Sequence, residues 1–319
     1  MVISCFPIGT TDVDINNLRA FSAVSELESF SAAAQRLHVT QPAISKRIGQ
    51  LEAQLRSPLF LRTGHGVRLT QAGVTLLPHA GRILGEVEAA NRAMTSLSGV
   101  VSGPLTIVTN HHIGVWRLPD LLRDFTGDYP EVRLDLRFTD SEPAHQLVLD
   151  GTVEVGIVTL APHPAARLTS VPLWDDALQV VVSVGHELAS ADSAQLSDLA
   201  AYRAILPGLS TYTGRLVRSR MGELGLTLQD VMTTNYLETL RMMAATGLGW
   251  SLLPASMVGP DLHVLAVPEL AVVRTLGLIH HRQHVLSAAA LAFIQATRSK
   301  TTSNAANPAN AGADSDRVR

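Results

Sequence analysis

The stretch that decides the fold is residues 29–48, SFSAAAQRLHVTQPAISKRI, which predicts two short helices separated by a turn at residues 38–39. The first helix, residues 31–37, is rich in alanine, whose small side chain lets another helix approach closely. Thr40 can cap the second helix, and Pro42 suits its first turn, where the missing N–H has no helical partner in any case. The stretch therefore predicts a helix-turn-helix whose second helix has a polar tip.

The second helix is expected over residues 42–55, and its two faces differ in polarity. The apolar face, at helical spacing, consists of Ile44, Ile48, Leu51 and Leu55. On the opposite face, glutamine can bond adenine, proline can contact a thymine methyl, and serine, threonine and lysine can hold phosphates. The expected DNA contacts in this motif are Ser31, Thr40, Gln41, Pro42, Ser45 and Lys46. The alternative is a solvated corner between two helices.

The residues on either side of the motif complete a small domain. Residues 14–27 predict a helix with Asp14 as its N-cap. Its apolar face is expected to consist of Ile15, Leu18, Phe21, Val24 and Leu27. Residues 60–63 and 67–70 predict a hairpin that carries Arg62 and Arg68. A basic hairpin beside a helix-turn-helix can act as a wing that touches the DNA backbone or minor groove, so these two arginines join the expected DNA contacts.

The distribution of charge supports a polyanionic partner for the amino-terminal part alone. The 319-residue chain has a formal charge of −3, yet its residues 13–70 contain seven Lys and Arg against four Asp and Glu. The single cysteine, Cys5, excludes a disulfide framework and a cysteine-based metal site. Because the sequence has neither a signal peptide nor an apolar run long enough for a bilayer, we expect a cytoplasmic protein with no membrane partner.

Several motifs together resemble those of the LysR-type transcriptional regulators. They are residues 30–48, Leu51-Glu52, Pro58-Leu59-Phe60, Arg62-Thr63 and Leu69-Thr70-Gln71-Ala72-Gly73. The resemblance is specific in the first 73 residues and extends in layout to about residue 298. It implies a winged helix-turn-helix at residues 13–70, with the helix-turn-helix itself at about 30–49, then a linker helix and an effector domain. Arg56 stands where the family usually has glycine, so we expect it to adopt the left-handed conformation at some cost.

Residues 71–98 predict the linker helix, with Thr70 as its cap and a bend near Pro78. Its apolar stripe consists of Val74, Leu77, Leu84, Val87, Met94 and Leu97. We expect this stripe to form the seam of a homodimer, which would place two DNA-binding domains on one near-palindromic site of double-stranded DNA. The family resemblance further implies a homotetramer, and contact with RNA polymerase if the protein is an activator.

Strands and helices alternate after residue 98, which predicts an α/β fold with parallel sheets. The expected strands are residues 105–109, 132–138, 153–160, 203–206, 231–234, 250–253 and 271–280, and the expected helices are 117–125, 143–149, 212–224, 236–245 and 287–297. Two similar units joined by a Pro-rich crossing predict a bilobed domain at 99–298, resembling type 2 periplasmic binding proteins. Its lobes are expected at about 99–161 with 268–298, and at about 162–267.

A ligand cleft is expected between the lobes, because open parallel sheets bind ligands beyond the carboxyl ends of their strands. The hydroxyl and N–H groups of those loops favour a small anionic or polar effector. The expected effector contacts are Thr109, Asn110, His111, His112, Thr139, Ser141, Gly208, Ser210, Thr211 and Thr213. For any single residue of this set, the alternative to effector binding is that its side chain only caps the loop.

No catalytic residue, metal site or cofactor other than the effector is expected. His111-His112 and His280-His281 are pairs of neighbours, which would point to opposite faces of a strand, and no serine lies in a Gly-x-Ser-x-Gly motif. The sequence therefore predicts a DNA-binding transcription regulator that is not an enzyme. A solute-binding receptor is the alternative for the C-terminal half, and a metal-dependent hydrolase is a third hypothesis. Residues 1–12 are expected to form a leader and 299–319 a disordered tail.

Overall fold

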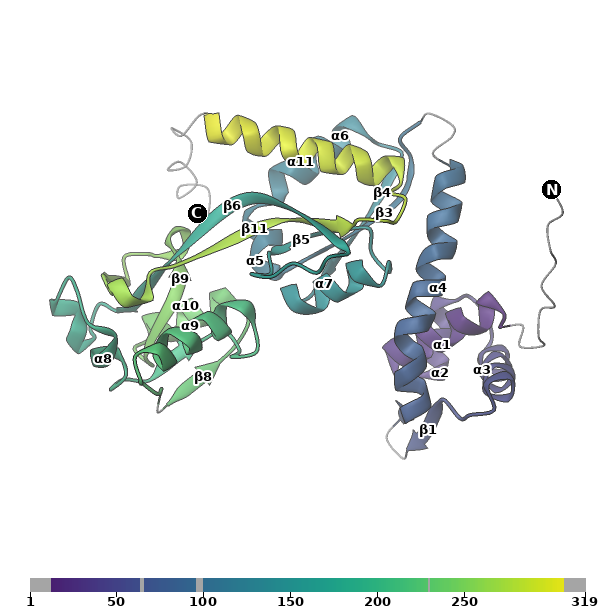
Figure 1. The fold of residues 1–319 in the computed structure, drawn as a ribbon, viewed down its shortest axis with the longest axis horizontal. Coiled ribbons are helices and arrows are strands. Elements are labelled where there is room, and N and C mark those ends of the chain that lie inside the picture. Colours follow the sequence, from purple (N-terminus) through teal and green to yellow (C-terminus); the bar gives the residue numbers. More distant parts are fainter. Residues whose placement is uncertain (1–12, 64–65, 96–99, 229, 307–319) are drawn as a thin grey trace. The chain divides into compact units, whose positions relative to one another are not determined.

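The computed structural model of the chain describes residues 13–63, 66–95, 100–228 and 230–306 (Figure 1). The chain divides into two compact units, with the division near residue 94. No helix among the described residues is long and apolar enough to cross a membrane.

The first unit is a small helical domain followed by a long helix. Its elements are α1 (Ile15–Leu27), α2 (Phe30–Arg36), α3 (Gln41–Leu55), β1 (Phe60–Thr63), β2 (Gly66–Leu69) and α4 (Gln71–Thr95). Helices α1, α2 and α3 enclose an apolar core that includes Phe21, Ala33 and Ile44, and β1 and β2 form an antiparallel hairpin. Helices α1 to α3 with this hairpin are called the reading head below.

The helix ends in the reading head follow from local hydrogen bonds. Asp14 accepts a bond from the N–H of Asn16 at 2.7 Å, and Ser29 accepts one from the N–H of Ala32 at 3.2 Å. Thr40 is the N-cap residue of α3, but its side chain makes no capping bond, so that part of the prediction is wrong. Arg56 closes α3 in the left-handed conformation with φ 52°, which confirms the expectation for this position.

Helix α4 begins as predicted, with the Thr70 hydroxyl accepting a bond from the N–H of Gly73 at 3.1 Å. Its apolar stripe differs from the prediction, because Leu77 and Leu84 pack against the core of the reading head instead of remaining uncovered. Val74 is 52% exposed. The side chains of two further predicted stripe residues, Met94 and Leu97, lie outside the described residues.

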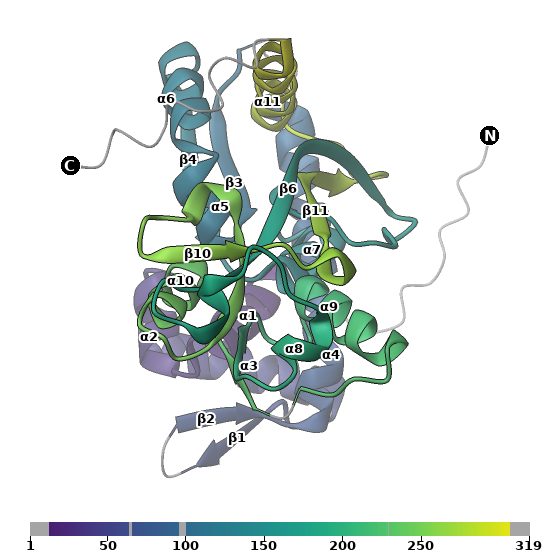
Figure 2. The ribbon, with the colours of Figure 1, turned by 90° about the vertical axis from the view of Figure 1, so that its left-hand side faces the viewer.

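The second unit is a bilobed α/β domain. Lobe 1 contains β3 (Gly103–Thr109), β4 (Val132–Phe138), β5 (Val155–Thr159), α5 (His111–Trp116), α6 (Pro119–Asp128), α7 (Ser141–Leu149) and α11 (Ala288–Ala306). Lobe 2 contains β7 (Ala204–Leu206), β8 (Val231–Thr233), β9 (Trp250–Pro254), β10 (Leu262–Leu265), α8 (Leu196–Leu199), α9 (Tyr212–Glu223) and α10 (Leu237–Ala245). Two long strands, β6 (Leu168–Ser183) and β11 (Val272–His281), belong to both lobes (Figures 1 and 2).

The expected parallel pairing is confirmed within each lobe, but the sheet of this unit as a whole is mixed. Its strand order is β4-β3-β5-β11-β6-β9-β7-β8, with β10 paired to β6. The neighbours of β3 and of β7 are parallel to them, whereas β11 is antiparallel to both β5 and β6. The two parallel parts are therefore joined by a pair of long antiparallel strands.

The long strands place the lobes beside each other. In β11, Val272 packs in the core of lobe 2, whereas Leu276 and Leu278 pack in the core of lobe 1. The strand therefore passes between the lobes within residues 272–276, and its register with β6 shifts just after this, between Leu276 and Gly277. The lobe boundaries therefore differ from the predicted ones, because β6 and β11 each contribute to both cores.

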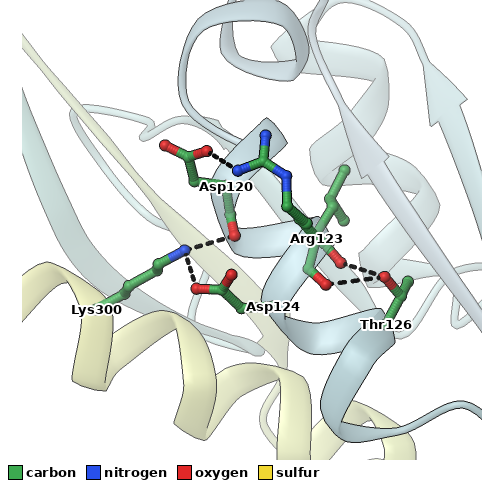
Figure 3. Close-up of polar contacts among 6 residues, drawn as sticks. Asp120, Arg123, Asp124, Thr126 and Lys300 are labelled. Atoms are coloured by element: carbon green, nitrogen blue, oxygen red, sulfur yellow. Dashed lines mark hydrogen bonds and ion pairs between the residues drawn. The ribbon is translucent and has the colours of Figure 1, made fainter.

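The predicted disordered tail is partly wrong, because α11 continues to Ala306. Lys300 donates to the carbonyl oxygen of Asp120 and forms an ion pair with Asp124, both on α6 (Figure 3). Thr297 and Thr301 donate their hydroxyl protons to carbonyl oxygens four residues earlier. The contacts of Lys300 and Thr301 show that the start of the predicted tail is helical and bonded, which its polar composition did not indicate. The leader and residues 307–319 lie outside the described residues.

Candidate functional site

The outer face of α3 is polar and exposed. Ile44 and Ile48 are buried, whereas Gln41, Pro42 and Lys46 on the opposite side are exposed. The amide of Gln41 donates to the hydroxyl of Ser45 at 3.1 Å, which restricts the glutamine side chain at the tip of the helix. One face of a single helix thus carries four of the predicted DNA contacts.

The remaining predicted DNA contacts lie around this helix. Thr40 is exposed at its start, Ser31 is exposed in the first turn of α2, and Arg68 is exposed on β2. Arg62 lies on β1 opposite Val67, and its side chain lies outside the described residues.

A cleft of about 460 Å³ lies between lobe 1 and lobe 2, and is called the interlobe cleft below. Of the predicted effector contacts, those that line it are Asn110, His111, His112, Thr139, Ser141, Thr211 and Thr213. Thr109 is fully buried in β3, and Gly208 and Ser210 do not line the cleft. Three further lining residues, Asp140, Pro207 and Tyr212, lie in the loops that the strand-end rule selects, although they are not among the expected contacts. The lining residues outside those loops are Phe138, Glu142, Thr159, Asn235, Tyr236, Leu237 and Arg274.

In the wall from lobe 1, two predicted residues hold the loops in place. Asn110 caps α5, since its Oδ1 accepts a bond from the N–H of Ile113 at 2.8 Å. Its amide donates to the Ser141 hydroxyl at 3.2 Å, and that hydroxyl accepts a bond from the N–H of Thr159 at 3.1 Å. Loop capping, the alternative considered above, therefore describes the present bonds of Asn110 and Ser141. Because Asn110 caps a helix, His111 and His112 lie in its first turn and not on a strand. The expectation that these two histidines point to opposite faces of a strand is therefore wrong.

The wall from lobe 2 is built around the start of α9. Thr211 caps this helix, with its hydroxyl accepting a bond from the N–H of Gly214 at 3.1 Å and donating to the carbonyl of Gly208 at 2.7 Å. A Cβ at Gly214 would lie 2.3 Å from the Gly208 carbonyl oxygen, so only glycine lets the loop fold this closely onto the helix. The first turn of α9 is thus fixed at the edge of the cleft.

Hydrogen bonds between described residues of the two lobes join them across the cleft region. Asn235 donates its amide to Asp140 at 2.6 Å, and the Trp116 indole N–H donates to Glu238 at 3.3 Å. The backbone N–H of Tyr212 donates to the carboxylate of Glu142. Each bond has one partner from each lobe, so they hold the cleft in the arrangement seen here.

The lining of the cleft includes a neutral histidine, His112, and one partner of a buried charge pair, Arg274. The Arg274 guanidinium on β11 donates through Nε to Asp176 on β6 at 2.7 Å, and their side chains are 12% and 4% exposed. Burial, followed by the positive charge of Arg274, lowers the pKa of His112 to about 4. His112 is therefore neutral at physiological pH and offers one donor and one acceptor. Neither ring nitrogen has a hydrogen-bond partner within the described residues.

Some of the unpredicted cleft residues had a signal in the sequence. Asp140 lies in the loop between Thr139 and Ser141, which the strand-end rule had already selected. Asn235 follows β8, so the same rule applied to that strand would have found it. Arg274 lies within a strand and reaches the cleft only because β11 passes between the lobes, so no local pattern marked it.

Comparisons with known proteins cover both units. The family described as "Bacterial regulatory helix-turn-helix protein, lysR family" matches residues 15–74, and "LysR substrate binding domain" matches residues 98–302. An uncharacterized HTH-type transcriptional regulator of Azotobacter vinelandii is 57% identical over 107 residues, which are 34% of this chain and 74% of that protein.

Two solved structures share the fold. Full-length CbnR in complex with its target DNA has a TM-score of 0.60 at 24% identity, covering 90% of this chain and 99% of that one. The effector-binding domain of QuiR in complex with shikimate has a TM-score of 0.57 at 19% identity, covering 63% and 98%.

The matched families describe a regulatory DNA-binding domain and the domain that accompanies it. Together they exclude the solute-binding receptor and the metal-dependent hydrolase as hypotheses for the chain, since the family consists of transcription regulators and not of enzymes. The chain belongs to the LysR family of DNA-binding transcriptional regulators with a C-terminal effector-binding domain.

Proposed function

We propose that this regulator reads double-stranded DNA with the exposed face of α3 and holds the DNA backbone with its wing. Gln41 would read a base, with Ser31, Thr40, Pro42, Ser45 and Lys46 beside it and Arg62 and Arg68 from the hairpin. The observation that supports this role is the division of α3 into a buried apolar face and an exposed polar face. CbnR, which is similar in fold, has been solved with its target DNA.

The regulator would act as a homodimer on a near-palindromic promoter site, because a two-fold protein matches a two-fold DNA sequence. Exposed apolar side chains on α4, such as Val74 and Ile83, offer surface that a second copy would cover. A homotetramer, and contact with RNA polymerase if the protein activates transcription, would follow the pattern of the family. Its site of action is the cytoplasm, where the DNA lies.

A small polar or anionic molecule would bind in the interlobe cleft and control DNA binding. Seven of the residues selected from strand ends line this cleft, and both lobes contribute to it. QuiR, which shares the fold, has been solved with shikimate in its effector-binding domain. Because the bonds from Asn235 to Asp140 and from Tyr212 to Glu142 join lining residues of the two lobes, a ligand that replaces or adds to them changes the relative free energy of the lobe arrangements.

Gel-shift titration of the full-length protein against its own upstream DNA tests the DNA-binding half of this proposal. Affinity should fall steeply as salt rises, because phosphate contacts release counterions. Binding that is absent or insensitive to salt would refute it.

A thermal-shift screen of organic acids and amino acids, also on the full-length protein, tests the effector half. Compounds that raise Tm should also change the affinity or the mobility of the DNA complex. The proposal is wrong if compounds stabilise the second unit and leave the DNA complex unchanged.

A further inference from the structure

The amino-terminal end of α9 holds a carboxylate that comes from the other lobe. Helix N-termini favour anions, because their first N–H groups have no helical partner. At α9, Thr211 satisfies the N–H of Gly214, and the N–H of Tyr212 donates to Glu142 from the first turn of α7. A position suited to the anionic group of a ligand is thus filled by a side chain of the protein itself.

No ion pair among the described residues explains the position of Glu142, although its charge acts on His145 one turn later in α7. Within the described residues it forms no ion pair with Lys, Arg or His, although it is only half-buried. The nearest cation on α9, Arg215, lies over the Tyr212 ring at 4.8 Å and donates to the carbonyl of Ser210. The contact with Tyr212 also spans 70 residues of sequence, so it forms only when the lobes are together.

A second observation in the same cleft points independently to a ligand. His112 lines the cleft, is only 4% exposed, and has no hydrogen-bond partner for either ring nitrogen within the described residues. Buried polar atoms without partners are rare, because each costs desolvation free energy. Arg274 also lines the cleft and uses its Nε for Asp176. The cleft therefore keeps polar groups available beside the filled helix terminus.

We propose that Glu142 is a built-in competitor, and that the effector is a carboxylic acid whose carboxylate replaces Glu142 at the start of α9. Other polar groups of the acid would meet His112 and Arg274. This inference rests on the proposed function, because it places the effector in the interlobe cleft. Replacement breaks a hydrogen bond between the lobes and substitutes one made through the ligand, so it couples binding to the lobe arrangement.

The competitor also sets the affinity of the site. If Glu142 occupies the α9 terminus about nine-tenths of the time, the apparent Kd of an acid is about tenfold weaker than without it. The regulator would then respond only when the acid is abundant. Removing the glutamate carboxylate should tighten binding of acids by about that factor.

Chemical rescue of the full-length protein tests this inference. Glu142→Ala leaves the α9 terminus open, so acetate should raise the Tm of this variant, and acetamide, which has the same shape without the charge, should not. Wild type should respond to neither compound at the same ionic strength. The matched control is Glu223→Ala at the other end of α9, where an exposed pair with Arg220 is lost and no acetate response is expected.

Glu142→Gln keeps the size of the side chain and one acceptor oxygen, so it serves if the alanine variant does not fold. Acetate should stabilise it more than it stabilises wild type. If acetate stabilises neither Glu142 variant beyond Glu223→Ala, the inference is wrong. That failure would leave DNA binding by the wild type intact, whereas failure of the proposed function would appear as absent or effector-independent DNA binding.

Discussion

The reading head and the interlobe cleft position their polar side chains in different ways. Gln41, Ser45 and Lys46 lie on one helix, and a single buried stripe fixes their direction. At and around the cleft, hydrogen bonds between the lobes join residues 70, 95 and 122 positions apart. Substitutions in the head should therefore act on single contacts, whereas substitutions in the cleft should act on the arrangement of a whole domain.

The largest effect is expected at the buried pair of Arg274 and Asp176. Asp176→Ala should lower the free energy of unfolding of the second unit by about 3–5 kcal/mol, because it leaves a buried guanidinium without its partner. Tryptophan fluorescence during urea denaturation measures this, since all three tryptophans, Trp116, Trp174 and Trp250, belong to the second unit.

The matched control for this substitution is Asp230→Ala. It removes the partner of Arg203 in an ion pair whose side chains are 44% and 54% exposed, so the loss should be about 0–1 kcal/mol. Equal losses in the two variants would mean that burial of the Arg274 pair has no energetic consequence, and the contrast between cleft and surface would fail.

The next largest effects are expected on the outer face of α3. Gln41→Ala should reduce discrimination between base pairs by about 1–3 kcal/mol, because a glutamine can make two bonds to one base. Lys46→Ala should weaken binding to every sequence and reduce the salt slope by about one, as expected for a phosphate contact. Gel shifts with the promoter and with a scrambled duplex over a range of salt concentrations separate the two effects.

A control for loss of charge is Arg220→Ala on α9, which removes an exposed cation from the second unit. It should leave both affinity and specificity unchanged. If the Gln41 and Lys46 variants behave like this control, α3 is not the helix that reads DNA.

Most of the reading head could be predicted because its signals are local. The caps Asp14 and Ser29 and the buried stripe of α3 each depend on residues within one or two turns of a helix. The prediction failed at the ends of α1, where Ile15 and Leu27 are 37% and 38% exposed. Helical spacing identifies a face, but it does not show where the neighbouring helices end.

The cleft could be predicted only where its residues follow a strand. Thr139 follows β4 directly, Thr211 ends the loop after β7, and the order of strands and helices in each lobe was also evident. Strand β6 was missed, because Pro172 and the acidic residues Asp175 and Asp176 interrupt its apolar pattern. These residues are accommodated by pairing with β11 about 100 residues later in the chain, which a local pattern cannot reveal.

Within the reading head, the two helix caps should differ by a measurable amount. Ser29→Ala should cost about 1 kcal/mol, because the serine hydroxyl bonds the N–H of Ala32. Thr40→Ala should cost less, because the Thr40 side chain makes no such bond, yet it should weaken DNA binding if that hydroxyl holds a phosphate. Thermal denaturation followed by circular dichroism gives the stabilities. Equal losses would show that Thr40 caps α3 in solution.

The smallest effect concerns Gly49, which is exposed in the middle of α3. A Cβ at this position would meet no atom of the described chain within 4 Å, so the fold of the head gives no reason for glycine there. Because glycine costs a helix about 0.5–1 kcal/mol relative to alanine, Gly49→Ala should stabilise the reading head by that amount.

The same substitution should nevertheless weaken DNA binding, since Gly49 shares its face with Ser45 and Lys46, and a methyl group there would separate the helix from the DNA. Thermal denaturation and gel shifts measure the two effects on one protein. Gly127→Ala on α6, where a Cβ also meets nothing within 4 Å, should raise stability without changing DNA affinity. If the Gly49 variant keeps full affinity, this part of α3 does not approach the DNA, and base reading is confined to the tip around Gln41.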